Sequence, residues 1–402
     1  MALTEKGCSA LQHIKQHFPS GAFSAKDLSD AAGEKIVAAT LNGVANNGYI
    51  VKLGGSPIQY EAVADLLELL ENLDTSAKTG CDNSNLAAAK RAKNDEVYTR
   101  YEDIEAEVMK YRRYFRNKVV YLPCDDPADK KSEFWSFFVN NFDAFGVKKL
   151  IATHYDENGK AYKIWIDGDT GGDGYIDDGD AQQEDLIGNG DFRSPECIDI
   201  LKECDIVCTN PPFSLFREYI AQLVEHNKKF LVIGNQNALT FKEIFPLLKD
   251  NKIWLGYKAG DMSFTVPAHY EARETRYWQD ENGQKWRSLG NICSYTNLDL
   301  PKRHEDLMLY KQYTIEEFPN YDNYAAINVN KISDIPYDYD GVMGVPITFF
   351  DKHNPNQFDI IGATESEGKG FSNGLWKSES KVAQPLINGK RIYKRIFIRR
   401  KR

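Results

Sequence analysis

The stretch Asp205-Ile206-Val207-Cys208-Thr209-Asn210-Pro211-Pro212-Phe213 decides the fold. Its first five residues form a largely apolar run, typical of a short buried strand. The four that follow place an amide oxygen, a rigid backbone carbonyl and a flat ring directly after that strand. Open α/β folds bind their ligands at the carboxyl ends of the strands. The stretch therefore predicts an α/β sheet with a site for a planar amine at its edge.

The tetrapeptide Asn210-Pro211-Pro212-Phe213 suits such an amine atom by atom. An exocyclic amino group is a poor nucleophile because its lone pair is delocalised into the ring. The side-chain oxygen of Asn210 and the carbonyl of Pro211 can each accept one N–H, while Phe213 stacks on the ring. The two prolines remove backbone donors that would compete for these acceptors. A Pro-Pro turn after a buried strand is the plainer alternative.

Length and composition predict a large globular protein. The chain has 402 residues, of which 42% are hydrophobic and 12% aromatic, enough for a sizeable core. No apolar run reaches the ~18 residues of a membrane span, and residues 1–6 lack the apolar segment of a signal peptide. Seven cysteines without C-x-x-C spacing argue against a disulfide framework and a zinc site. We therefore expect a cytoplasmic protein with reduced cysteines and no membrane association.

The net charge of −9 has a local origin. Residues 156–205 hold 15 Asp or Glu against 4 Lys or Arg, which leaves 44 acidic and 46 basic groups elsewhere. A balanced remainder is compatible with a polyanionic partner. At the C-terminus, residues 390–402 alternate basic and apolar types, as in a strand with one charged face that follows phosphates. A solvated edge strand is the alternative interpretation of that segment.

Residues 1–74 are expected to form a small domain of their own. Helical periodicity covers 5–17, 24–32 and 35–47, and residues 48–63 have the pattern of a hairpin. This order predicts a winged helix-turn-helix, whose third helix would enter a major groove. That helix is thinly basic, so a protein-contact or dimerisation module is the rival interpretation.

A polar linker is expected at 75–86, followed by a catalytic core over 87–256. Helices and strands alternate in this core, which predicts a mostly parallel, doubly wound sheet. The expected helices are 103–115, 131–145 and 215–226, and the expected strands are 118–122, 149–153, 205–209 and 230–234. Residues 257–402 are irregular and rich in aromatics, Asn and Gly. We expect them to form a β-rich region for target recognition that completes the catalytic domain.

Five blocks in one order give the chain a specific resemblance. Over about residues 87–402 it resembles the EcoRI-type family of adenine-specific DNA methyltransferases, and the first 74 residues lie outside that likeness. An Asn-Pro-Pro-Phe motif alone marks amino-methylating enzymes in general, whereas all five blocks together are far more discriminating. The blocks are Lys93-Asn94-Asp95-Glu96-Val97-Tyr98-Thr99, Cys124-Asp125-Asp126-Pro127, Gly190-Asp191-Phe192-Arg193-Ser194, Thr209-Asn210-Pro211-Pro212-Phe213 and Tyr295-Thr296-Asn297-Leu298-Asp299.

The resemblance implies a Rossmann-like, S-adenosylmethionine-dependent methyltransferase fold of the α/β class. It carries a β-rich C-terminal recognition region, and here a small N-terminal winged helix-turn-helix domain is added. The residues that the resemblance assigns to catalysis are Asn210, Pro211, Pro212 and Phe213. Those that it assigns to the cofactor are Tyr98, Thr99, Cys124, Asp125, Asp126, Pro127, Asp191, Phe192 and Asn210.

Each cofactor role has a physical counterpart. A carboxylate after the strand at 118–122 suits the α-ammonium of the methionine moiety, and Thr99 suits its carboxylate. Asp191 can accept the adenine amine while Phe192 packs on the ring. Asp156 is a candidate for the ribose hydroxyls, although a solvated loop acid is the better interpretation there. The glycine-rich turn usual in methyltransferases is absent after Leu122, as it is in the family.

Two other regions invite interpretation. The acidic stretch 167–178 is rich in Asp and Gly but misses the EF-hand spacing, so we expect a solvated hairpin and no metal. Base reading is expected from the aromatic-rich stretch 257–290 together with Asn297, Lys302 and Arg303.

The function expected from the sequence is site-specific methylation of adenine N6 in double-stranded DNA, with the target base flipped out of the duplex. A restriction endonuclease counterpart and a homodimer stay open. One alternative is a methyltransferase that acts on RNA or on a protein glutamine, because the same motif accepts either amine. The other is a non-catalytic winged-helix regulator that binds DNA.

Overall fold

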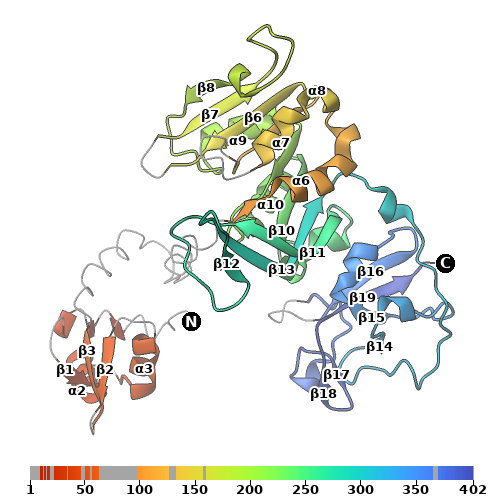
Figure 1. Cartoon of the computed structure of the whole chain (residues 1–402). Coiled ribbons are helices and arrows are strands. Elements are labelled where there is room, and N and C mark those ends of the chain that lie inside the picture. The colour runs from red at the N-terminus through yellow and green to blue at the C-terminus, as the bar shows by residue number, and fades with distance from the viewer. Residues whose placement is uncertain are drawn as a thin grey trace. The chain divides into compact units, whose positions relative to one another are not determined.

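A computed structural model describes residues 10–62, 97–125, 133–156, 160–364 and 370–401, apart from 12, 15, 19–21, 34, 47–49 and 55–56. The chain forms two compact units, Met1–Lys93 and Asn94–Arg402 (Figure 1). The linker expected at 75–86 lies outside the described residues, as do Asp126 and Pro127. Within the described residues, no helix is long and apolar enough to cross a bilayer.

The first unit joins helices to a three-stranded antiparallel sheet of order β1-β3-β2. Helix α2 begins at Ser24, whose hydroxyl accepts from the Asp27 N–H while the Asp27 side chain returns to Ser24, a capping box. The helix ends at Gly33, where φ is 68°. The elements are β1 (Ala22–Ser24), α2 (Ala25–Ala32), α3 (Ala38–Asn46), β2 (Ile50–Gly54) and β3 (Gln59–Ala62).

The helices expected at 24–32 and 35–47 and the hairpin after them are therefore confirmed as elements. The helix expected at 5–17 falls partly outside the described residues. The assignment of this unit as a winged helix, and its role, stay predictions.

The second unit is built on a ten-stranded sheet of order β4-β11-β13-β10-β9-β5-β6-β7-β8, with β12 paired to β13 (Figure 1). The strands are β4 (Tyr98–Thr99), β5 (Val119–Leu122), β6 (Lys149–His154), β7 (Tyr162–Ile166), β8 (Gln182–Asp185), β9 (Ile206–Thr209), β10 (Lys229–Asn235), β11 (Trp254–Thr265), β12 (Tyr277–Gln279) and β13 (Lys285–Thr296).

Only the centre of this sheet is parallel. Strands β10, β9, β5 and β6 run in the same direction, whereas β13, β11, β4, β7 and β8 pair antiparallel. The expectation of a mostly parallel sheet was wrong, because consecutive strands at both ends of the sheet form hairpins that need no crossover helix. The sheet is mixed, in an α/β unit.

Helices cover both faces of the parallel centre. Alternate residues of β5 face opposite layers: Val119 and Tyr121 pack with α9 (Pro195–Glu203) and α10 (Phe216–Glu225). Val120 and Leu122 pack with the other layer, α6 (Tyr101–Val108), α7 (Phe134–Asn140) and α8 (Phe142–Phe145). This strict alternation in a fully buried strand anchors the middle of the unit.

The helices and strands expected for the core are confirmed with small shifts at their ends. The helix expected at 103–115 is α6 followed by the 3₁₀ helix η1 (Met109–Tyr114), and that expected at 131–145 is divided into α7 and α8. The boundary expected at 256 falls inside β11, so the second half of the chain contributes β11, β12 and β13 to the central sheet.

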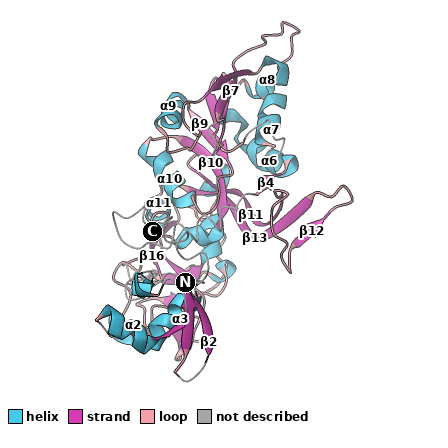
Figure 2. Ribbon diagram, turned by 90° about the vertical axis from the view of Figure 1, so that its left-hand side faces the viewer, coloured by secondary structure: helices cyan, strands magenta, loops and turns pink. Residues whose placement is uncertain are grey.

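Strands β11 and β13 form a long hairpin whose far end, with β12, projects from the unit (Figure 2). We call residues 266–284, which join the two strands, the arm. Because β11 runs antiparallel to β13, and β13 antiparallel to β10, the arm lies beyond the carboxyl edge of the parallel strands. β4 pairs with the end of β11 nearest the arm, Thr99 opposite Phe264 and Tyr98 opposite Thr265.

The C-terminal residues form a second sheet of order β14-β15-β19-β16. Its strands are β14 (Ile327–Asn328), β15 (Met343–Pro346), β16 (Phe358–Ala363) and β19 (Arg395–Arg400). In β19 the residues Ile396, Phe397 and Ile398 are all buried, because this strand lies between two others. The expectation that 390–402 forms one strand with a charged face was wrong: the segment holds two strands, and β19 is a core strand.

Glu107 of α6 fixes the irregular start of β11. Its carboxylate accepts the backbone N–H groups of Tyr257 (3.0 Å) and Lys258 (2.7 Å) and the hydroxyl of Tyr111 (2.8 Å). These N–H groups lie where the pairing of β11 with β13 shifts register, so they have no regular place in the ladder. The side chain is 6% exposed, which makes it the buried acceptor for the bulge.

We predict that Glu107→Ala lowers the free energy of unfolding by about 1–3 kcal/mol, because two partly buried N–H groups lose their charged acceptor. Glu105→Ala, an exposed position of the same helix, is the matched control and should stay within about 0.5 kcal/mol of the wild type. Chemical denaturation of both variants measures the difference. Equal stability of the two would show that the bulge does not need Glu107.

Candidate active site

The candidate site lies where the strand order reverses direction. From β5 the chain moves outward to β6 on one side and later returns to β9 on the other side of β5. Such a switch point opens a crevice at the carboxyl ends of the two strands. Cys124 and Asp125 follow β5 and Asn210 follows β9, so the structure brings these predicted residues to one edge. The hydroxyl of Thr209, the last residue of β9, is buried and has no hydrogen-bond partner in the described part of the chain.

Asn210 has a defined amide orientation. Its Nδ2 donates to the carbonyl oxygen of Val97 at 2.7 Å. Its Oδ1 is buried and accepts no hydrogen bond within the described part of the chain, and the residue is 9% exposed. A buried acceptor without a donor costs about 1–3 kcal/mol, and the sites where native proteins tolerate that cost are often functional. The oxygen is thus poised to accept an N–H from a ligand.

The prolines of the motif lead the chain into α10. The N–H of Leu215 donates to the carbonyl of Pro212 at 3.0 Å, which closes a turn before the helix begins. Phe213 is partly buried and packs against the layer formed by α6, α7 and α8. The turn expected as the plainer alternative is therefore present, and the same turn presents Asn210 at the sheet edge.

β4 brings Tyr98 and Thr99 to the same edge. The carbonyl that Asn210 contacts belongs to Val97, the residue directly before β4. The hydroxyl of Thr99 is buried and, within the described residues, unpaired; the residue is 1% exposed. Two unpaired buried polar atoms, this hydroxyl and the Asn210 oxygen, at the same edge of the sheet favour a polar ligand site there.

The two residues of interest after β5 are Cys124, a neutral thiol, and Asp125, a buried acid. Burial raises the pKa of Cys124, and the neighbouring Asp125 raises it further, so Cys124 stays a neutral thiol. Asp125 is 1% exposed. The expected cofactor residues Asp126 and Pro127 lie outside the described part of the chain.

Asp191 is held by Arg193, a residue to which the sequence analysis gave no role. Its Oδ1 accepts from Nε of Arg193 at 2.8 Å and its Oδ2 from Nη2 at 2.6 Å. This fork lowers the pKa of Asp191. The Arg193 guanidinium also lies 5.2 Å from the centre of the Phe192 ring, whose edge meets Tyr219. The sequence did contain a sign of this ion pair, because an arginine stands two residues after the aspartate.

Asp156, the candidate for the ribose, lies near this loop. Its backbone N–H donates to the carbonyl of Asn189 at 3.0 Å, so the end of β6 is joined to the residues before Asp191. The site residues of β4, β5, β6 and β9 and of the 189–193 loop therefore belong to one edge of the sheet, but their roles stay predictions.

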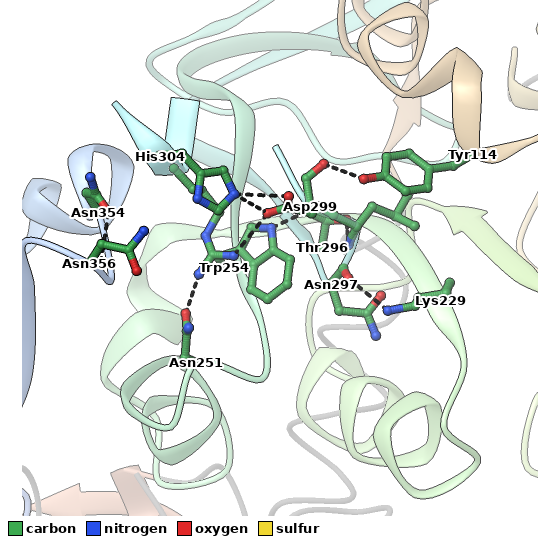
Figure 3. A network of polar contacts seen from close by, with 12 residues as sticks. Tyr114, Lys229, Asn251, Trp254, Thr296, Asn297, Asp299, His304, Asn354 and Asn356 are labelled. Carbon is green, nitrogen blue, oxygen red and sulfur yellow. Dashed lines mark hydrogen bonds and ion pairs between the residues drawn. The ribbon is translucent and has the colours of Figure 1, made fainter. Parts of the chain in front are cut away.

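The block Tyr295–Asp299 lies at the opposite edge, because Thr296 pairs with Leu231 near the start of β10. Figure 3 shows the polar contacts around this block. The side chain of Asn297 accepts the N–H of Phe230 at 3.0 Å and donates to the carbonyl of Lys228 at 2.8 Å, which fastens the start of β10. The hydroxyl of Thr296 donates to the carbonyl of Phe230 at 2.6 Å. The block is thus structural in this fold.

The expected base readers Lys302 and Arg303 also make internal contacts. Nζ of Lys302 contacts Asp351 at 2.8 Å, and the guanidinium of Arg303 stacks on Trp254 at 3.6 Å from the ring centre. Arg303 is only 6% exposed. The expectation that Asn297, Lys302 and Arg303 reach base edges was wrong, because all three side chains are engaged inside the protein. Lys302 and Arg303 belong to the 3₁₀ helix η4 (Pro301–His304).

The acidic insert uses its carboxylates on its own backbone. Oδ1 of Asp180 accepts the N–H groups of Thr170 and Gly171, and its Oδ2 accepts that of Asp177. Asp169 accepts the N–H groups of Gly172 and Gly174 in the same way. These bonds lower the pKa of Asp180 to about 2, the contact with Asp177 most strongly.

A hollow of about 780 Å³ lies between β4, the first turn of α6 and the base of the arm. Its aromatic walls are Tyr98, Tyr101 and Trp286. Arg100 at its rim is paired with Asp103, and Nζ of Lys285 donates to two backbone carbonyls. With these two cations engaged, the hollow suits an uncharged planar group better than a phosphate.

The fold and site define an α/β protein with an Asn-Pro-Pro-Phe turn at the carboxyl edge of its sheet. The chain belongs to the family described as adenine-specific methyltransferase EcoRI, which it matches over residues 85–401. Residues before 85 lie outside that match.

Three relatives agree with this membership. The chain is 47% identical over 333 residues to the Type II methyltransferase M.EcoRI of Escherichia coli, covering 80% of this chain and 97% of the relative. It is 38% identical over 320 residues to the Type II methyltransferase M.MgeORF184P of Mycoplasma genitalium, covering 78% and 97%. It is 38% identical over 278 residues to M.MpnI of Mycoplasma pneumoniae, covering 68% and 83%.

We predict that Arg193→Met raises the pKa of Asp191 toward the ordinary value of about 3.9, because the fork that stabilises the carboxylate is lost. The stability that the fork contributes is present above that ordinary pKa and is lost as the pH falls through the lowered one. Titration of the carboxyl carbon by NMR measures the shift. Lys202→Met, which removes the exposed partner of Asp199, is the control and should leave Asp191 unchanged.

Proposed function

We propose that the protein is a site-specific DNA methyltransferase that transfers a methyl group from S-adenosylmethionine to N6 of adenine. The observation that carries the proposal is the buried, unpaired Oδ1 of Asn210 at the switch point of the sheet. Membership of an adenine-specific methyltransferase family supports the choice of adenine, and three Type II methyltransferase relatives support DNA.

The residues present fit S-adenosylmethionine. The unpaired hydroxyl of Thr99 suits a carboxylate, and the buried carboxylate of Asp125 suits an ammonium, the two charged groups of a methionine moiety. Asp191 would hold the adenine amine, with Phe192 beside the ring. When bound, the sulfonium supplies an activated methyl group, so the protein needs only to position the acceptor.

In the proposed mechanism Asn210 and Pro211 hold the amine and Phe213 stacks on the base. Oδ1 of Asn210 accepts one N–H of the amine, which draws the nitrogen toward tetrahedral geometry and turns its lone pair to the methyl group. The carbonyl of Pro211 accepts the second N–H. The nitrogen would take the methyl group as the carbon–sulfur bond breaks and leaves a neutral thioether, and the alkylated nitrogen would then lose one proton to water. The increase in reaction rate comes from the orientation of the amine and from the preorganised dipoles that hold it.

Reaching the base requires flipping it from the duplex, at a cost of a few kcal/mol. The hollow beside β4 has room for a nucleobase and is lined by Tyr98 and Thr99, although no residue of the Asn210–Phe213 motif lines it. The arm carries exposed Arg273, Arg276 and Trp278 and lies beyond the same sheet edge as Asn210. We assign target recognition to the arm, within the stretch 257–290 expected from the sequence.

We predict that Asn210→Ala lowers the methylation rate about 10²-fold or more while S-adenosylmethionine still binds, because one preorganised polar contact is lost. Single-turnover transfer of labelled methyl to a DNA duplex measures the rate, and calorimetry measures cofactor binding. An unchanged rate would remove Asn210 from the mechanism. The same measurement of labelled methyl transfer, made with RNA and with protein as acceptors, tests the alternative substrates.

The first unit is proposed to strengthen DNA binding or dimerisation. Helix α3 carries no charged residue in its sequence Ala-Ala-Thr-Leu-Asn-Gly-Val-Ala-Asn, and Val51 and Leu53 of β2 are half exposed. A basic recognition helix is thus absent from the described part of this unit, which favours the protein-contact interpretation over groove reading.

Deletion of residues 1–74 is predicted to leave the single-turnover methylation rate unchanged and to weaken DNA affinity or self-association. The reason is that the family match begins at 85 and the second unit holds the whole candidate site. Fluorescence anisotropy and sedimentation measure the two affinities. Loss of cofactor binding in the truncated chain would contradict this division.

A further inference from the structure

The amide of Asn210 could in principle face the substrate with either its oxygen or its nitrogen. Only the oxygen can accept an N–H, so the proposed mechanism needs the amide nitrogen to be held elsewhere. Among the residues that the structure describes, one contact does this: Nδ2 donates to the carbonyl of Val97 at 2.7 Å, across 113 residues of sequence.

That carbonyl is itself held in place. Val97 is 9% exposed, and β4 begins at the next residue, where Tyr98 pairs with Thr265 and Thr99 with Phe264. Phe264 is fully buried in the layer that covers the α6 face of the sheet. The Val97 carbonyl therefore cannot turn away without breaking the β4–β11 pairing.

We propose that the main-chain carbonyl of Val97 is the positioning group of the active site: it sets which atom of the Asn210 amide faces the substrate. The inference rests on the proposed function, since it explains how Asn210 is prepared for that reaction. Val97 does not touch the reacting atoms; it acts only through Asn210. The same contact links catalysis to the arm, because β4 is paired to the end of β11 from which the arm leaves.

Asn210→Asp separates this role from a merely structural one. An ionised carboxylate at 210 offers only acceptors, so it repels the Val97 carbonyl, whereas a protonated one can donate to Val97 and still accept from the substrate. The ratio of the variant's single-turnover rate to that of the wild type should rise as the pH falls from about 8.5 to about 6, up to about tenfold per unit, toward the raised pKa of a buried carboxyl.

Other titrating groups at this edge do not mimic that result. Those on the packed elements are Tyr98 of β4, Cys124 and Asp125 after β5, Cys208 of β9, and Asp191 with Arg193 in the 189–193 loop. The fork from Arg193 holds the pKa of Asp191 below its ordinary value, outside the tested range. Burial raises the pKa of Cys124 and of Cys208 above their ordinary value, away from the tested range. Asp125 and Tyr98 are present in both proteins and divide out of the ratio. If the new carboxylate acted as a general base, the ratio would instead rise with pH.

A backbone change tests Val97 directly. Replacing the Val97–Tyr98 amide by an ester makes the Val97 carbonyl a weaker acceptor and should lower kcat by about three- to tenfold, with KM for DNA unchanged. The matched control is an ester at the Ser263–Phe264 bond of β11, which also removes one strand N–H but weakens a carbonyl that Asn210 does not contact. Calorimetry with S-adenosylmethionine verifies that both proteins are folded.

Two results would overturn the inference: a ratio for Asn210→Asp that does not rise as the pH falls, or equal kcat for the two esters. The proposed function would survive either result, provided that the wild type methylates adenine and that Asn210→Ala is inactive. A wild type that transfers no methyl group to adenine would instead refute the proposed function itself.

Discussion

The hydrogen bond between the Asn210 amide and the Val97 carbonyl is the contact on which the site depends. It satisfies the nitrogen and leaves the buried oxygen unsatisfied. The unpaired oxygen lowers the stability of the fold by about 1–3 kcal/mol, and the packing of the surrounding core has to offset this loss. Here the core is a parallel centre covered by helices on both faces, with residues of β5 and β9 almost wholly buried. A substrate N–H recovers the cost on binding.

Much of the central architecture could be predicted because its signals are local. Apolar runs such as 206–209 and 119–122 form strands wherever they are covered on both faces, and the Pro-Pro turn after Thr209 marks a strand end by itself. The order of these strands placed Asn210, Asp125 and Thr99 at one edge. The residue type of Asn210 then indicated a hydrogen-bond acceptor for an amine at that edge.

The remainder depended on contacts that sequence spacing does not encode. Asn297 and Arg303 have the residue types of base readers, yet tertiary contacts with Lys228 and Trp254 commit them to packing. The basic and apolar alternation at 390–402 resembles an edge strand, but β15 and β16 flank β19 on both sides. Val97 gave no signal at all, because a main-chain carbonyl looks the same at every residue.

The acidic insert occupies the end of the sheet farthest from the arm, since β8 is the last strand beyond β6 and β7, while β4 and the β11–β13 hairpin lie at the other end. Its residues contribute to the segment with 15 acidic and 4 basic groups. A duplex that drifts toward that end meets like charge, felt over about 8 Å at physiological salt. The excess of carboxylates therefore disfavours the approach of any polyanion at the β8 end of the sheet.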